Sequence, residues 1–208
     1  MKLSIISFFC TAVILIACNN NGGNTESTNT NTHAQHEAIK TSGYADSVNN
    51  GLIAQDTMKS SVPRVAMQTV GNTHVHIAYS SPGVKGRIIW GGLVPYNAVW
   101  VTGAHSATKI TLNNAIIINN KKVEAGTYAI FTIPGEKEWI FILNKNFEQH
   151  LADNYSDKDD VLRVAVVPQE NAMTQRLTYA VTKQTDKNGS IEVCWEKIKI
   201  TVPFNTAG

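Results

Sequence analysis

The sequence predicts an all-β fold, and three observations support this prediction. Beyond residue 63 the apolar residues recur with a period of two, which is the spacing of side chains on one face of a strand. Gly, Pro, Asn and Asp interrupt these runs at short intervals, as turns between strands do. A continuous helical period is almost absent from the same region. We therefore expect residues 61–208 to form one antiparallel β-sandwich with a jelly-roll-like architecture.

The alternating runs place the individual strands. Residues 73–79 give the clearest one, because Val75, Ile77 and Tyr79 alternate with side chains of the opposite face. The runs 129–131 and 139–143 are apolar on both faces, which is typical of strands in the centre of a sheet. The other strands are expected at residues 107–112, 115–118, 127–133, 138–143, 162–167 and 177–181.

The last strand changes its alternation midway. Ile191, Val193 and Trp195 share one face, whereas Ile198 and Ile200 follow in the opposite phase. A slip of one residue moves side chains to the other face of a strand. The sequence therefore predicts a β-bulge near Glu196-Lys197 that keeps both halves on the core.

The first 17 residues have the form of a signal peptide. Lys2 precedes an apolar run at residues 3–16, which is shorter than the roughly 20 residues that span a bilayer. The tetrapeptide ending at Cys18, LIAC, resembles the lipobox of bacterial lipoproteins. That resemblance implies acyl chains such as palmitate on Cys18, with the lipid bilayer as partner. We expect a membrane-anchored protein of the Gram-negative cell envelope, periplasm-facing or surface-exposed, with the outer membrane favoured.

Residues 18–60 are rich in Asn, Thr, Ser and Gly, a composition that predicts a flexible, disordered linker behind the lipidated cysteine. Two triplets within it, Asp46-Ser47-Val48 and Asp56-Thr57-Met58, resemble an acceptor pattern for O-glycosylation at Ser47 and Thr57. Plain linker sequence is the alternative interpretation of both triplets.

The net charge argues against nucleic-acid binding, and the cysteine content argues against a disulfide-stabilised domain. The formal net charge is +2, which is too small to attract nucleic acid. Cys194 is the only cysteine after the linker, so we expect no disulfide within the domain. Its neighbours Glu192 and Glu196 are expected to raise the pKa of its thiol, which favours a structural role.

Residues 83–106 form a long predicted loop that carries the candidate binding residues. Aromatic rings beside an arginine suit a glycan or peptide ligand, through stacking and cation–π contact. The alternative is that Leu93, Val94 and Trp100 simply cap one end of the sandwich. The candidate ligand-binding residues are Arg87, Trp90, Tyr96, Trp100 and His105.

A second hypothesis is a metal-dependent envelope enzyme. His74 and His76 have the spacing of two metal ligands on one strand face, and His105 would supply a third. Residues 77–82 contain no carboxylate to complete a cupin-like set, and no G-x-S-x-G elbow places a serine nucleophile. We therefore favour a non-enzymatic binding or structural module with no cofactor, and keep the three-histidine metal site as the alternative.

Several stretches resemble the bacterial family called domain of unknown function 2911. Residues 79–96 read YSSPGVKGRIIWGGLVPY, and residues 125–128 and 132–139 read AGTY and TIPGEKEW. The resemblance covers residues 63–204 and implies a secreted or lipid-anchored β protein without naming its chemistry. This sequence departs from the family pattern at Val101, where the family usually has arginine. It departs again at His105-Ser106, where the family usually has Asn-Glu.

Overall fold

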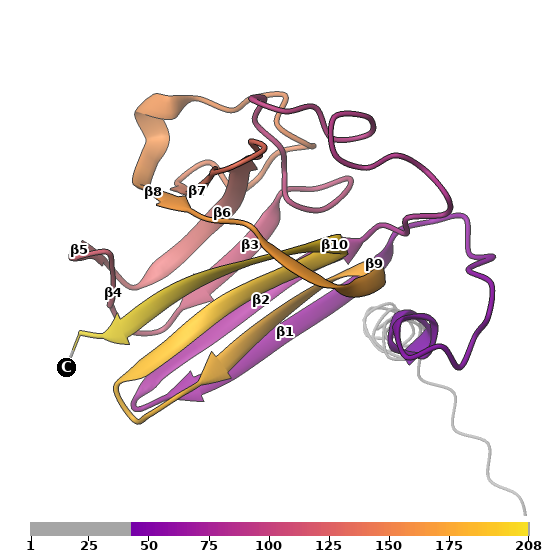
Figure 1. The fold of residues 1–208 in the computed structure, drawn as a ribbon. Coiled ribbons are helices and arrows are strands. Elements are labelled where there is room, and N and C mark those ends of the chain that lie inside the picture. Colours follow the sequence, from indigo (N-terminus) through magenta and orange to yellow (C-terminus); the bar gives the residue numbers. More distant parts are fainter. Residues whose placement is uncertain (1–42, 208) are drawn as a thin grey trace, which may run out of the picture.

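The computed structural model describes residues 43–207 and shows two antiparallel sheets that share one apolar core (Figure 1). The predicted all-β sandwich is confirmed. Sequence neighbours mostly pair as antiparallel hairpins. The larger sheet has the order β1 (Val62–Val70), β2 (Thr73–Ser81), β3 (Thr108–Leu112), β6 (Gly126–Ile133), β7 (Trp139–Asn144), β8 (Asp160–Val166). The smaller sheet has the order β5 (Lys121–Val123), β4 (Ile116–Ile118), β10 (Asn188–Thr206), β9 (Gln169–Lys183).

Local sequence accounts for the turns and faces of these strands. Val75, Ile77 and Tyr79 of β2 are buried, as their alternation predicts. The β4–β5 hairpin turns at Asn119 and Asn120, whose φ angles are 47° and 61°. Two consecutive positive φ angles define the type I′ turn, which matches the twist of paired strands and which Asn tolerates well.

The predicted β-bulge in the last strand is confirmed. The β9–β10 register shifts on both sides of Glu196, and Glu196 itself has a φ of 54°. Trp195 before the bulge and Ile200 after it are both buried in the same core, although their positions differ in parity. The bulge therefore allows a 19-residue strand to keep its apolar side chains on one face.

The central strands β6 and β7 carry apolar side chains on both faces because both faces are covered. Ile130 and Phe141 point into the core between the sheets. Phe131 and Ile142 point the other way into a second, smaller core. Val101 and Ala107 of the β2–β3 loop (residues 82–107) cover this second core, together with Phe147 and Ala152. The two-faced pattern thus requires that long loops fold over the outside of the sheet.

Residues 43–61 form an ordered strap, which corrects the expectation that the linker stays flexible to residue 60. The strap starts with a helical segment at residues 43–49, in which Ala45 and Val48 are buried. The Asn49 side-chain amide donates 3.0 Å hydrogen bonds to the Arg176 carbonyl and to the Thr178 hydroxyl. The strap could not be predicted from composition, because its few apolar and charged residues are ordered by contacts with β9, which is distant in sequence.

The remaining N-terminal predictions lie outside the described residues. These are the signal peptide at residues 1–17, the lipidated Cys18 and the linker up to residue 42. Within residues 43–207, the helical stretches are too short and too polar to cross a bilayer.

Candidate functional site

A cavity of about 780 Å³ opens under the β2–β3 loop. Four parts of the chain build its wall: the strap, the loop itself, the β7–β8 connection (residues 145–159) and the buried Trp195 of β10. The lining residues are Lys59, Ser60, Ser61, Pro82, Gly83, Lys85, Arg87, Leu93, Val94, Val99, Trp100, Val101, Gly103, Ala104, His105, Leu151, Ala152, Asp153 and Trp195.

The β2–β3 loop is held by backbone hydrogen bonds at both ends. It begins with a tight turn, in which Lys85 and Gly86 have φ angles of 50° and 69° and the Arg87 amide bonds the Val84 carbonyl. Farther along, Trp100 and Thr132 of β6 exchange two hydrogen bonds of 2.8 and 2.9 Å. Trp100 therefore occupies a strand-like position beside β6, from which it lines the cavity.

All four tryptophans of the chain meet in one cluster behind the cavity. Trp100 and Trp195 are stacked, with ring centroids 5.6 Å apart and an interplanar angle of 19°. Trp90 contacts the other three rings edge-on, at centroid distances of 4.8 to 5.8 Å. Aromatic pairs in such geometries stabilise a fold beyond simple burial. Trp100 and Trp195 are the members of the cluster that line the cavity, and they form its aromatic floor.

Thr102 supports this floor in a strained conformation. It is fully buried, and its φ of 50° is unfavourable for a β-branched residue. Its hydroxyl lies 2.9 Å from that of Thr132, and its carbonyl accepts a 2.9 Å hydrogen bond from the Tyr179 hydroxyl. These bonds hold the backbone between the lining residues Val101 and Gly103.

The β7–β8 connection is fixed by a buried carboxylate. Asp160 accepts 2.7 Å hydrogen bonds from the Asn144 amide, the Tyr155 hydroxyl and the Arg163 guanidinium. Burial, together with the hydrogen bond to Asp160, raises the pKa of Tyr155 to about 12. The connection also reaches the loop, because the Leu151 amide donates a 2.6 Å hydrogen bond to the His105 carbonyl. This network positions Leu151 and Ala152 in the cavity wall.

The strap wall depends on Arg176 of β9, whose side chain is fully buried. Its guanidinium donates a 2.8 Å hydrogen bond to Asp56 and further bonds to the carbonyls of Met58 and Ser60. The ring of Tyr44 lies 5.3 Å from the guanidinium carbon. Arg176 therefore holds the strap segment that brings Lys59, Ser60 and Ser61 to the cavity.

Opposing influences act on the pKa of Asp56. Burial raises it, but the hydrogen bond and charge of Arg176, assisted by Tyr44 and Lys85, outweigh burial and hold the pKa below its ordinary value of 3.8. Asp56 is therefore ionised at neutral pH and forms a buried ion pair with Arg176.

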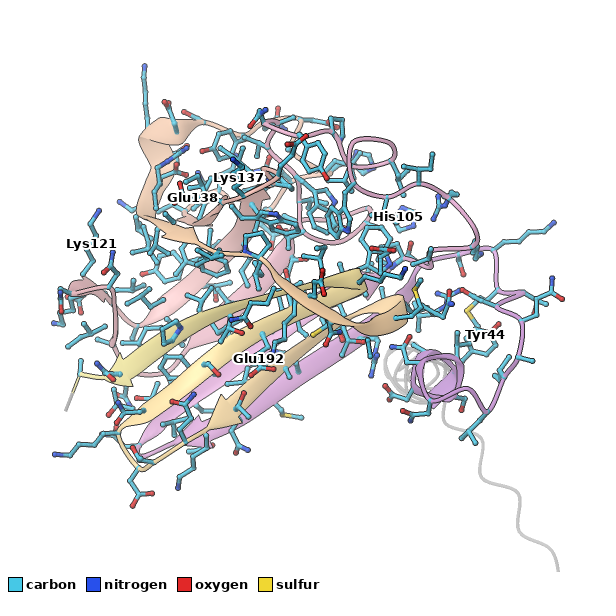
Figure 2. All side chains as sticks on the ribbon, in the orientation of Figure 1. Tyr44, His105, Lys121, Lys137, Glu138 and Glu192 are labelled. Carbon is cyan, nitrogen blue, oxygen red and sulfur yellow. The ribbon has the colours of Figure 1, made fainter. Side chains whose placement is uncertain are left out.

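Three of the five predicted ligand-binding residues, Arg87, Trp100 and His105, line the cavity. Figure 2 shows His105 on the β2–β3 loop, on the side of the molecule away from Lys121 of β5. Trp90 does not line the cavity and belongs to the aromatic cluster. Tyr96 is also outside it and lies close to Gly91.

The structure does not gather the three histidines of the metal hypothesis. His74 and His76 lie on the outer face of β2, with ring centroids 6.5 Å apart, whereas His105 lines the cavity. No group of three His, Cys, Asp or Glu side chains within residues 43–207 could hold a metal ion. The two-residue spacing of His74 and His76 puts both on one face of β2, but the β2–β3 loop places His105 at the cavity.

Sequence reasoning missed the contributions of Lys59, Lys85, Leu151, Asp153 and Trp195 to the cavity. One signal was available for Lys85, because it stands two residues before Arg87 in the same turn-rich motif. The other four come from segments that are remote in sequence, and no local pattern connects them with the loop.

The fold and the cavity define an all-β sandwich protein with a loop-covered pocket. Residues 61–204 match the family model described as a protein of unknown function (DUF2911), and the chain belongs to this family. No curated protein and no solved structure matches the chain.

Proposed function

We propose that this protein is a lipid-anchored binding module of the bacterial cell envelope, with the cavity under the β2–β3 loop as its ligand site. The N-terminal sequence supports the anchor, because a signal peptide leads into a lipobox at Cys18. Acyl chains on that cysteine would hold the protein on a bilayer that faces the periplasm or the cell exterior.

The cavity carries the binding part of the proposal. Its volume of about 780 Å³ falls within the range of known ligand sites, roughly 300–1,000 Å³. Its lining is mostly apolar and includes a stacked tryptophan pair, while a few polar groups stand among them. Such a surface suits the binding of an apolar or aromatic ligand. The alternative, a metal-dependent enzyme, needs His74, His76 and His105 together, and no such group occurs among the described residues.

A binding screen tests the ligand site. The screen uses residues 18–208 with Cys18→Ser, a protein that contains all the described residues but cannot be lipidated. It is applied to arrays of glycans, peptides and lipids. We expect a ligand whose binding is lost in Trp100→Ala and retained in Tyr96→Ala, because Trp100 lines the cavity and Tyr96 does not. Binding that survives Trp100→Ala in a protein with unchanged circular dichroism would refute the assigned site.

Membrane fractionation tests the anchor. The full chain is expected in the membrane fraction, and the Cys18→Ser variant is expected in the soluble fraction or retained as uncleaved precursor. A Cys10→Ser variant is the control, since Cys10 lies in the leader that is removed. Equal membrane association of mature Cys18→Ser protein would contradict lipidation at this cysteine.

A further inference from the structure

The cavity has an excess of positive charge where it meets solvent. Lys59, Lys85 and Arg87 are exposed and also line the cavity. None of the three forms an ion pair with a carboxylate among residues 43–207. Asp153 is the one acidic lining residue, and His150 contacts its carboxylate at 3.0 Å. Lys85 also interacts with the charge of Asp56 and helps to lower its pKa, although Asp56 forms its ion pair with Arg176. Lys59 and Arg87 have no carboxylate partner among the described residues, so this edge of the cavity keeps an excess of positive charge.

Several polar groups that line the cavity are hydrogen-bond donors. The indole Nε1 of Trp195 is buried and has no acceptor among the described residues, although this residue lines the cavity. The ammonium groups of Lys59 and Lys85 and the guanidinium of Arg87 can only donate hydrogen bonds. Lys85 already donates one to the Met58 carbonyl, and Arg87 donates to the carbonyls of Val84 and Gly83, but each group has further N–H bonds to offer. A complementary ligand would therefore offer acceptors, and a negative charge would strengthen each bond.

The rest of the cavity surface is apolar. Trp195, Val94 and Val101 are buried and Trp100 is partly buried, whereas Leu93 remains 47% and Leu151 38% exposed. These two leucines are exposed to water at the edge of the cavity, and an apolar ligand would cover them. A glycan would leave these aliphatic groups without a suitable partner.

From this combination we infer that the cavity binds an amphipathic anion, with a carboxylate or phosphate head on Lys59, Lys85 and Arg87 and an apolar body against the tryptophan floor. The inference rests on the proposed binding function and names its ligand class. An anionic head would pair with cations that form no ion pair among residues 43–207, and an apolar tail would cover Leu93 and Leu151.

Isothermal titration of residues 18–208 carrying Cys18→Ser tests the inference with four probes. Dodecanoate and dodecyl phosphate carry the two kinds of head, 1-dodecanol has the same chain without charge, and maltoheptaose represents a neutral glycan. Dodecanoate or dodecyl phosphate is expected to bind about tenfold or more tightly than dodecanol, as one charge-assisted hydrogen bond would give. The stronger of the two anions identifies the head.

Charge variants locate the binding. Lys59→Gln, Lys85→Gln and Arg87→Gln together are expected to remove the advantage of the anion over dodecanol. A matched triple variant changes the net charge equally at three lysines that do not line the cavity: Lys121→Gln, Lys137→Gln and Lys187→Gln. This variant is expected to keep the advantage of the anion over dodecanol. Lys59→Gln alone is the variant least expected to disturb the fold, because the Lys59 side chain makes no hydrogen bond to residues 43–207. It should weaken anion binding with unchanged circular dichroism.

The outcomes separate the ligand class from the binding function. Equal affinity for dodecanoate, dodecyl phosphate and dodecanol, or equal losses in both triple variants, would overturn the anionic head. Binding of maltoheptaose or an array peptide in a Trp100-dependent manner, without binding of either anion, would overturn the inference and leave the proposed function standing. Failure of every ligand class would overturn both.

Discussion

Trp100 and Trp195 stack at a centroid distance of 5.6 Å, although one belongs to the β2–β3 loop and the other to β10. Each ring occupies its place for a different reason. Trp100 is held by its backbone pairing with Thr132, and Trp195 by the strand just before the β-bulge at Glu196. The contact therefore connects a loop of the large sheet with the small sheet at the floor of the cavity.

The buried ion pair between Arg176 and Asp56 is expected to be a major determinant of stability. Arg176→Met leaves the Asp56 carboxylate buried without its partner, which typically costs about 3–5 kcal/mol. Urea denaturation followed by circular dichroism measures the loss. Lys183→Met, which breaks the exposed pair with Asp186, is the control and should change the midpoint little. Similar midpoints for both variants would show that the strap is not held by this pair.

The same ion pair predicts an acid-dependent loss of stability. The pKa of Asp56 is lower in the folded protein than its ordinary value of 3.8, so folding favours the charged form. Its stabilising effect is complete above pH 3.8 and is lost as the pH falls through the lower, folded pKa. The difference in unfolding free energy between the unmodified protein and Asp56→Asn should therefore shrink below about pH 4. If this difference in unfolding free energy grew as the pH fell, the pKa of Asp56 would have to be raised by folding, and the prediction would be wrong.

The hydroxyl of Tyr179 is expected to stabilise the strained Thr102. Tyr179→Phe removes the 2.9 Å hydrogen bond to the Thr102 carbonyl and is expected to lower the free energy of unfolding by about 1–3 kcal/mol. Tyr96→Phe is the matched control, because Tyr96 is only half-buried and stands outside the cavity. Chemical denaturation of both variants provides the measurement, and equal stabilities would argue against a supporting role for Tyr179.

Cys194 is expected to react slowly with thiol reagents. Burial raises the pKa of its thiol, and the charge of Glu192 raises it further, while Lys199 partly opposes them. Of the two neighbouring carboxylates expected to act on Cys194, Glu192 therefore does so and Glu196 does not contribute. Mass spectrometry after iodoacetamide treatment at pH 8 should show little modification in native protein and full modification in urea. The Glu192→Gln variant should react somewhat faster, since one source of the raised pKa is gone. Rapid alkylation of the native protein would contradict the structural role.

Local alternation allowed much of the fold to be predicted. Most strands, the two-faced runs of β6 and β7 and the β-bulge at Glu196 follow from the spacing of side chains along one segment. The edge strands β1 and β5 and the first half of β9 were not predicted. The family was recognisable from motifs such as residues 79–96, and residues 61–204 match it. The same motifs pointed to the β2–β3 loop, three of whose five predicted binding residues line the cavity.

The cavity itself was decided by tertiary structure. Arg176 and Asp56 lie 120 positions apart in sequence, and their pairing turns a predicted linker into one wall of the cavity. The spacing of residues within a segment reports which face a side chain takes, but not which distant segment it will meet. The sequence alone determined the sheet and the loop, and only the burial of the loop, strap and β7–β8 connection against that sheet created a site.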